Sequence, residues 1–113
     1  MNDSILDSIK KLIGGIPADY TNFDEDVITE INMAFARLFT LGVGPLSGFS
    51  IQDNSSTWDD FMDDTPIRNL CKTYVQLKVR LVFDTPTNSA VLQEMKDEVK
   101  ELEWVLNFME DVG

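Results

Sequence analysis

The fold class of this chain depends on residues 74–84, which read YVQLKVRLVFD. Apolar and polar side chains alternate through this segment, which is the period-two pattern of a half-buried β-strand. The residues before it favour a helix, because Thr65 is a capping residue and Pro66 stands where a helix best tolerates proline. Polar side chains then recur mostly three or four residues apart, at Asn69, Lys72, Thr73, Gln76 and Arg80.

A helix from Pro66 accounts for about eighteen residues, which is longer than most strands, so we predict a helix here. Its polar stripe is narrow, and a helix that is apolar on most sides must be covered on most sides. Because a chain of 113 residues builds few elements, we expect a neighbouring subunit to supply part of the cover.

Two helices are predicted in the first third of the chain. A short one begins at a cap provided by Asn2 or Asp3 and ends at Gly14. A second one is capped by Asn22, carries acidic residues in its first turn and ends at Gly42.

Residues 42–56 contain three glycines, a proline and a serine cluster, and predict a long loop. We expect a short extended piece within it at residues 49–51. Thr57 then caps a single helical turn over residues 58–62.

A final helix follows a cap at Thr87, Asn88 or Ser89 and runs to about Glu110. Its apolar residues step by three and four, at Leu92, Met95, Val99, Leu102, Leu106 and Met109. This seam is typical of a helix that packs lengthwise on another, here the helix from Pro66. The predicted fold is therefore all-α: a small bundle of four to five helices with one long loop, forming a single domain over residues 1–113.

Three apolar residues of the final helix, Trp104, Val105 and Phe108, lie off this seam. They give the last turns an apolar surface on a second side. Exposed apolar surface of this kind indicates a contact with a partner.

Charge is abundant and unevenly distributed along the chain. Twenty acidic residues against nine basic ones give a net charge of −11, which disfavours binding to nucleic acid because that affinity comes from basic groups. Acidic residues cluster at Asp53, Asp59, Asp60, Asp63 and Asp64, and basic ones follow at Arg68, Lys72, Lys78 and Arg80. Segregation of the two signs helps neighbouring copies of one protein to recognise each other.

The sequence offers little for catalysis or metal binding. Cys71 is the only cysteine and the chain has no histidine to activate it, so we interpret it as a core residue. Residues 53–64 have the length of a calcium loop, but Trp58 stands where its sharp turn requires glycine and no glutamate closes it. Paired carboxylates lack an accompanying nucleophile or base. We predict no enzymatic activity, no metal and no cofactor.

The sequence also lacks the features of a membrane or secreted protein. Its apolar runs are only a few residues long. Asp3 and Asp7 stand where a signal peptide carries lysine or arginine. We expect a soluble protein made in the cytoplasm, with no membrane partner.

Several segments taken in order carry a resemblance to a known family. They are ILDSIKKLIGGIPADY, LGVGPLSGFSI, TWDDF, YVQLKVRLVFDTP and ELEWVLN. In this order they resemble the small head-to-tail connector proteins, also called head completion or adaptor proteins, of long-tailed bacteriophages and prophages of Gram-positive bacteria. The resemblance covers nearly the whole chain and rests on packing and turn patterns.

The resemblance implies a helical, non-enzymatic structural protein of the virion neck, assembled in the cytoplasm of the host bacterium. It implies a homo-oligomeric ring, dodecameric on the portal, that docks on the portal protein and extends the channel through which DNA leaves the head. DNA passes through without specific binding, and a downstream connector or tail-completion protein binds the ring.

The resemblance implies that the C-terminal helix docks on the portal, here through Trp104, Phe108 and Met109. A second candidate contact surface lies in the loop region with Phe49, Trp58 and Phe61. The acidic candidates for the channel wall or a subunit contact are Asp59, Asp60, Asp63 and Asp64. The basic candidates for a subunit contact are Arg68, Lys72 and Arg80.

Two other functions are compatible with some of these features. An acidic helical protein that mimics DNA or regulates a host factor would account for the net charge of −11, but leaves the apolar C-terminal surface unexplained. A DNA-packaging recognition subunit would need a basic helix-turn-helix, and no basic face of sufficient length is present.

Overall fold

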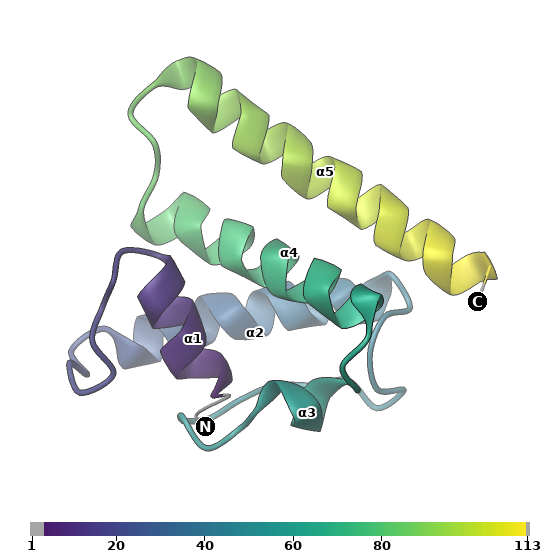
Figure 1. Cartoon of the computed structure of the whole chain (residues 1–113), viewed down its shortest axis with the longest axis horizontal. Coiled ribbons are helices and arrows are strands. Elements are labelled where there is room, and N and C mark those ends of the chain that lie inside the picture. Colours follow the sequence, from purple (N-terminus) through teal and green to yellow (C-terminus); the bar gives the residue numbers. More distant parts are fainter. Residues whose placement is uncertain (1–3, 113) are drawn as a thin grey trace.

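The computed structural model describes residues 4–112, and this part of the chain is a bundle of five helices (Figure 1). They are α1 (Ile5–Leu12), α2 (Asp24–Thr40), α3 (Trp58–Phe61), α4 (Pro66–Phe83) and α5 (Ser89–Val112). Residues 4–112 contain no β-strand, only an isolated bridge between Ser4 and Thr57. The all-α prediction is confirmed, including the helical interpretation of residues 74–84.

Three of the predicted helix caps are confirmed. Thr57 and Asp60 form a capping box, in which the side chain of each accepts a hydrogen bond from the backbone N–H of the other. The Thr65 hydroxyl accepts from the backbone N–H of Arg68 at 3.3 Å, ahead of Pro66. Asn88 accepts hydrogen bonds from the N–H groups at the start of α5.

The caps of the first two helices differ from the prediction. Ser4 is the N-cap of α1, whereas Asn2 and Asp3 lie outside the described residues. Phe23 precedes α2 and makes no side-chain cap, and the Asn22 amide donates to the Tyr20 hydroxyl instead. The acidic first turn of α2 supplies favourable charge near its N-terminus without an Asn22 cap.

The extended piece expected at residues 49–51 does not become a strand. The backbone N–H of Ile51 donates to Asn32 Oδ1 at 2.8 Å, and Asn32 Nδ2 donates to the Ile51 carbonyl at 2.9 Å. A side-chain amide on α2 therefore takes the place of a strand partner, and it fastens the long loop to the bundle.

Helix α4 is the central element of the bundle. It packs against α1 and α2 on one side and against α5 on the other (Figure 1). Cys71, Tyr74, Val75 and Val79 of α4 are completely buried. The 24 residues of α5 thus cover one side of α4 from within the chain, while Val82 of α4 stays 55% exposed. The expected contribution of a neighbouring subunit stays a prediction.

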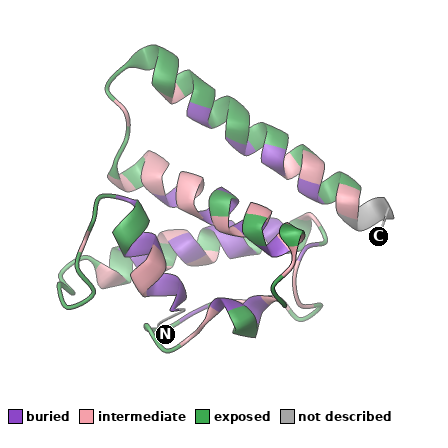
Figure 2. Cartoon of the chain, viewed as in Figure 1, coloured by how far each residue is buried: buried purple, intermediate pink, exposed green. Residues whose placement is uncertain are grey.

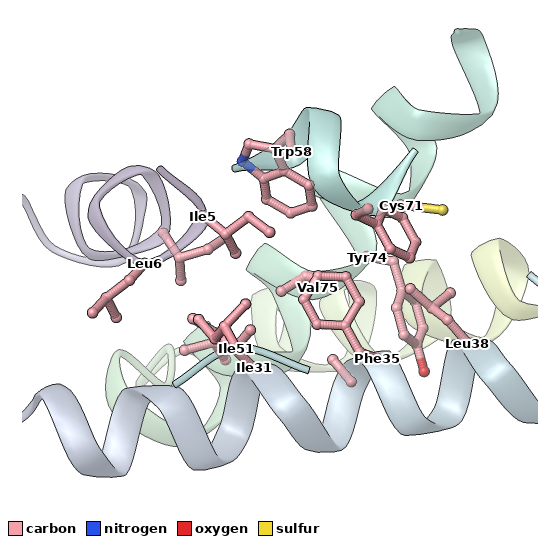
Figure 3. Close-up of a cluster of buried hydrophobic side chains, with 14 of the residues drawn as sticks. Ile5, Leu6, Ile31, Phe35, Leu38, Ile51, Trp58, Cys71, Tyr74 and Val75 are labelled. Carbon is pink, nitrogen blue, oxygen red and sulfur yellow. The ribbon is translucent and has the colours of Figure 1, made fainter. Parts of the chain in front are cut away.

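The core includes a cluster of aromatic side chains from α2, α3 and the long loop, of which Phe35 and Trp58 are labelled in Figure 3. The Phe35 ring of α2 lies 4.8 to 6.0 Å from the rings of Phe49, Trp58 and Phe61, measured between centroids. Trp58 Nε1 donates a hydrogen bond to the Ser8 hydroxyl of α1 at 3.0 Å. These contacts join the short helix α3 to the two helices that precede it.

The connection between α1 and α2 is held by a buried lysine. Lys10 is only 1% exposed. Its ammonium group donates to the carbonyls of Ala18 and Tyr20, at 3.2 and 2.6 Å, and forms an ion pair with Asp24 at 2.7 Å. These three partners satisfy the charge that burial would otherwise make costly.

Candidate interaction surface

The surface of interest is built on α5, whose inner side is fixed to the rest of the molecule. Figure 2 shows the buried positions of α5 on the side that faces α4 and exposed positions along its outer side. The buried seam consists of Met95, Val99, Leu102 and Leu106, with Leu92 and Met109 partly buried. The predicted packing of the final helix on the helix from Pro66 is confirmed.

A polar contact fixes the rotation of α5 about its own axis. The Tyr74 hydroxyl of α4 donates to Glu103 Oε2 at 2.6 Å. Arg37 of α2 donates to the same carboxylate through Nε and Nη2, at 3.4 Å each. Nearby, Asn107 Nδ2 donates to the Leu41 carbonyl at 3.2 Å. Three helices therefore meet at Glu103.

The pKa values at this contact follow from its geometry. Partial burial opposes ionisation of Glu103, but the hydrogen bonds from Tyr74 and Arg37 outweigh it and lower the pKa of the carboxyl group. Burial, together with the adjacent carboxylate, raises the pKa of the Tyr74 hydroxyl. The hydrogen bond to Glu103 raises the pKa of Arg37. All three shifts favour an ionised carboxylate beside a neutral phenol.

With its inner side fixed, α5 presents an aromatic pair on its outer side. Trp104 is 66% exposed and Phe108 is 52% exposed. Their rings stack with centroids 5.4 Å apart and planes only 5° from parallel. Because the two residues stand one helical turn apart, they form a continuous apolar surface. Met109, the third residue expected at this contact, is partly buried in the seam instead.

The aromatic residues expected near the long loop occupy different positions. Phe49 is partly buried against the core. Trp58 is 0% exposed and Phe61 is 5% exposed, so both are core residues and not part of an open contact surface. An aromatic residue beside a glycine-rich loop has the same sequence pattern in either role, and only the tertiary fold separates them.

Most of the acidic residues expected at a channel wall or a subunit contact have partners within the chain. Asp59 and Asp64 both form ion pairs with Arg68. Asp60 completes the capping box of α3. Asp63 is exposed. The loop is therefore organised largely by its own contacts.

Each of the expected basic candidates contacts a partner within the chain. Arg68 is buried, and it engages Asp59, Asp64 and the Met62 carbonyl of its own chain. Lys72 lies 5.4 Å above the Trp58 ring centroid, in a cation–π contact. Arg80 pairs with Asp84. Each of the three cations expected at a subunit contact is thus engaged by a neighbour in its own chain.

Two grooves along the sides of α5 were not predicted from the sequence. One, of about 400 Å³, is lined by Leu77 of α4 and by Val91, Glu94, Met95, Asp97, Glu98 and Glu101 of α5. The other, of about 410 Å³, is lined by Lys78 and Leu81 of α4 and by Gln93, Lys96, Val99, Lys100 and Glu103 of α5. The sequence signal that could have found the second groove is the spacing of Lys96 and Lys100. They stand four residues apart, so they share one side of the helix.

The described residues show no arrangement suited to holding a metal ion. Nowhere in residues 4–112 do three Cys, Asp or Glu side chains gather as metal ligands would. Nor is any helix in that part of the chain both long and apolar enough to cross a membrane. What stands out is an external surface on α5.

Searches of curated proteins and of solved structures gave no match. The family model described as phage connector protein matches residues 5–113, which is nearly the whole chain. This match confirms the resemblance to head-to-tail connectors, and it favours a structural role in the phage over the alternative of an acidic DNA mimic. The chain therefore belongs to the phage connector protein family.

Proposed function

We propose that this protein is a non-enzymatic, ring-forming head-to-tail connector, which docks on the portal through the outer side of α5 and extends the channel for DNA. The observation that carries the docking surface is the stacked pair of Trp104 and Phe108, exposed on a helix that is otherwise fastened to its own bundle. Large aromatic side chains of this kind dominate the binding energy of protein interfaces.

The rigidity of α5 supports this assignment. The seam on α4 and the hydrogen bonds at Glu103 hold the helix in place, so the aromatic pair is already oriented before a partner arrives. A preorganised surface loses less conformational entropy on binding than a mobile one. Docking then costs little reorganisation of the bundle.

The net charge of −11 supports passage of DNA without retention. Binding to the phosphate backbone requires lysine and arginine to release counterions. In this chain Lys10, Arg37, Arg68 and Arg80 are already engaged in ion pairs. In the proposed ring, exposed acidic residues such as Asp63 contribute to a wall that repels phosphate.

The test is to replace Trp104 and Phe108 together by serine. The isolated variant should keep its melting temperature within a few degrees, because neither side chain belongs to the buried seam. Its co-sedimentation with portal rings of the same phage should fall at least tenfold, since two interface anchors are lost.

A matched control replaces Met33 and Val82 by serine. These residues are exposed to a similar extent, on α2 and α4. The control should bind portal rings normally. Normal binding by the Trp104→Ser/Phe108→Ser variant would overturn the docking surface, and a large loss of its stability would make the aromatic pair part of the folded core.

A further inference from the structure

The distribution of ion pairs leaves one group of lysines free for a partner. Lys78, Lys96 and Lys100 form no ion pair within the described part of the chain. All three line one groove between α4 and α5. Glu103 also lines this groove, but Tyr74 and Arg37 already engage its carboxylate. Lys78 also lowers the pKa of Glu103 through its charge. The basic flank, meaning Lys78, Lys96 and Lys100, therefore presents positive charge that is compensated only in part, at Lys78.

The opposite flank of α5 carries the opposite charge. The groove beside Leu77 is lined by Glu94, Glu98 and Glu101. These glutamates form no ion pair in residues 4–112. No basic residue is among those that line this groove. The acidic flank, meaning Glu94, Glu98 and Glu101, borders two apolar side chains, Leu77 of α4 and the exposed Val91 of α5.

The helical repeat places the two flanks on opposite sides of α5. At 3.6 residues per turn, Glu94, Glu98 and Glu101 share one side of the helix, and Lys96 and Lys100 share the side across from it. The same repeat puts Trp104 and Phe108 on the outer crest between the flanks. The crest thus lies between the two flanks and adjoins both.

We infer that the basic flank of one copy docks on the acidic flank of the next copy of this chain. This inference rests on the proposed ring and names the two faces that form it. Because the faces are different and lie on opposite sides of one helix, each copy uses both, and the contact is head-to-tail. Such heterologous contacts generate a closed ring when the rotation between copies closes.

The composition of the grooves suits a contact between copies. The chain as a whole carries a charge of −11, so two copies repel each other unless opposite charges meet locally. Lysines facing glutamates provide that local attraction and fix the register. Leu77 and Val91 on one side and Leu81 on the other add apolar area beside the charges. The crest remains open for the portal.

The experiment uses two charge-reversal variants in analytical ultracentrifugation. Lys96→Glu/Lys100→Glu makes both flanks acidic, and Glu98→Lys/Glu101→Lys makes both flanks basic. Each variant alone should remain a monomer under conditions in which the wild-type chain associates. An equimolar mixture should associate again, because every contact in an alternating assembly would then pair opposite charges.

A control with the same change in net charge as the second variant is Asp19→Lys/Asp26→Lys, at two exposed positions outside both flanks. It should associate like the wild-type chain. Circular dichroism of each variant checks that the charge reversals leave the helices intact.

Three results would overturn the inference. In the first, both charge-reversal variants associate as the wild-type chain does, so the ring uses other faces and the proposed function stands. In the second, the mixture stays monomeric, so the two flanks do not recognise each other. In the third, the wild-type chain stays monomeric up to about 1 mM, where a contact with a millimolar Kd would be visible. Portal co-sedimentation tests the proposed function separately in each case.

Discussion

Glu103 shows how one side chain sets the orientation of a whole surface. Its carboxylate receives the Tyr74 hydroxyl from α4 and the Arg37 guanidinium from α2. A rotation of α5 would break these hydrogen bonds and would move Trp104 away from the outer crest. Glu103 thus acts on the proposed docking surface without belonging to it.

The pH dependence of stability should reveal this contact. The pKa of Glu103 is lowered below its ordinary value of 4.5 in the folded chain, so the unfolded chain binds more protons between the two values. Its stabilising contribution is therefore fully present above about pH 5 and is lost as pH falls through the lowered pKa. At neutral pH, Glu103→Gln should lower the free energy of unfolding by about 2 kcal/mol.

The measurement is urea unfolding of both proteins from about pH 7 down to about pH 3. The difference in free energy of unfolding between wild type and Glu103→Gln should become smaller in acid. Glu98→Gln is the matched control, because Glu98 is exposed and makes no ion pair in residues 4–112, and its gap should stay near zero. An equal gap for Glu103→Gln at both ends of the range would contradict the role of its charge.

At the residue scale, the caps of the last three helices were predictable, whereas those of the first two and the burial of aromatics were not. Thr57 and Thr65 stand directly before helical segments, and capping depends on residues three positions away. The burial of Trp58 depends on Ser8 and Phe35, which are distant in sequence. Local patterns therefore identify Thr57 correctly, but cannot separate Trp58 in the core from Trp104 on the surface.

At the scale of elements, the connection between α1 and α2 depends on Lys10. Replacing Lys10 by Met keeps the buried stem but removes the ammonium group, so Asp24 and the carbonyls of Ala18 and Tyr20 lose their partner. We expect the free energy of unfolding to fall by about 2–3 kcal/mol. Urea denaturation measures the change.

Lys11→Met is the control for this prediction, because Lys11 is the exposed neighbour of Lys10 and makes no ion pair in the described residues. It should alter stability by less than about 0.5 kcal/mol. Hydrogen exchange should also quicken at residues 14–23 in Lys10→Met alone. Equal effects of the two substitutions would contradict the proposed role of Lys10.

Sequence patterns identified the helices more fully than they identified the surfaces. The helix over 66–83 was predictable because a cap, a proline and a polar stripe all indicate the same element. The packing of α5 on this helix was predictable from the apolar seam, but the side of α4 that α5 takes depends on the tertiary fold. The charged flanks of α5 also depend on that choice of side.

At the scale of the whole molecule, the excess of acidic groups should govern behaviour toward DNA. We expect fluorescence anisotropy to detect no retention of duplex DNA at physiological salt, with any Kd weaker than about 10⁻⁴ M. A preparation of the assembled ring should behave in the same way. Micromolar binding by either form would count against a channel wall that lets DNA pass.

The burial of Trp58 and the exposure of Trp104 also give the molecule an intrinsic optical label. The chain has only these two tryptophans, and one is sealed in the core while the other is open to water. A soluble quencher such as iodide reaches the open indole and not the sealed one. Emission that iodide can quench therefore comes from Trp104. Loss of this quenching when a partner is added would show that the partner covers the crest of α5.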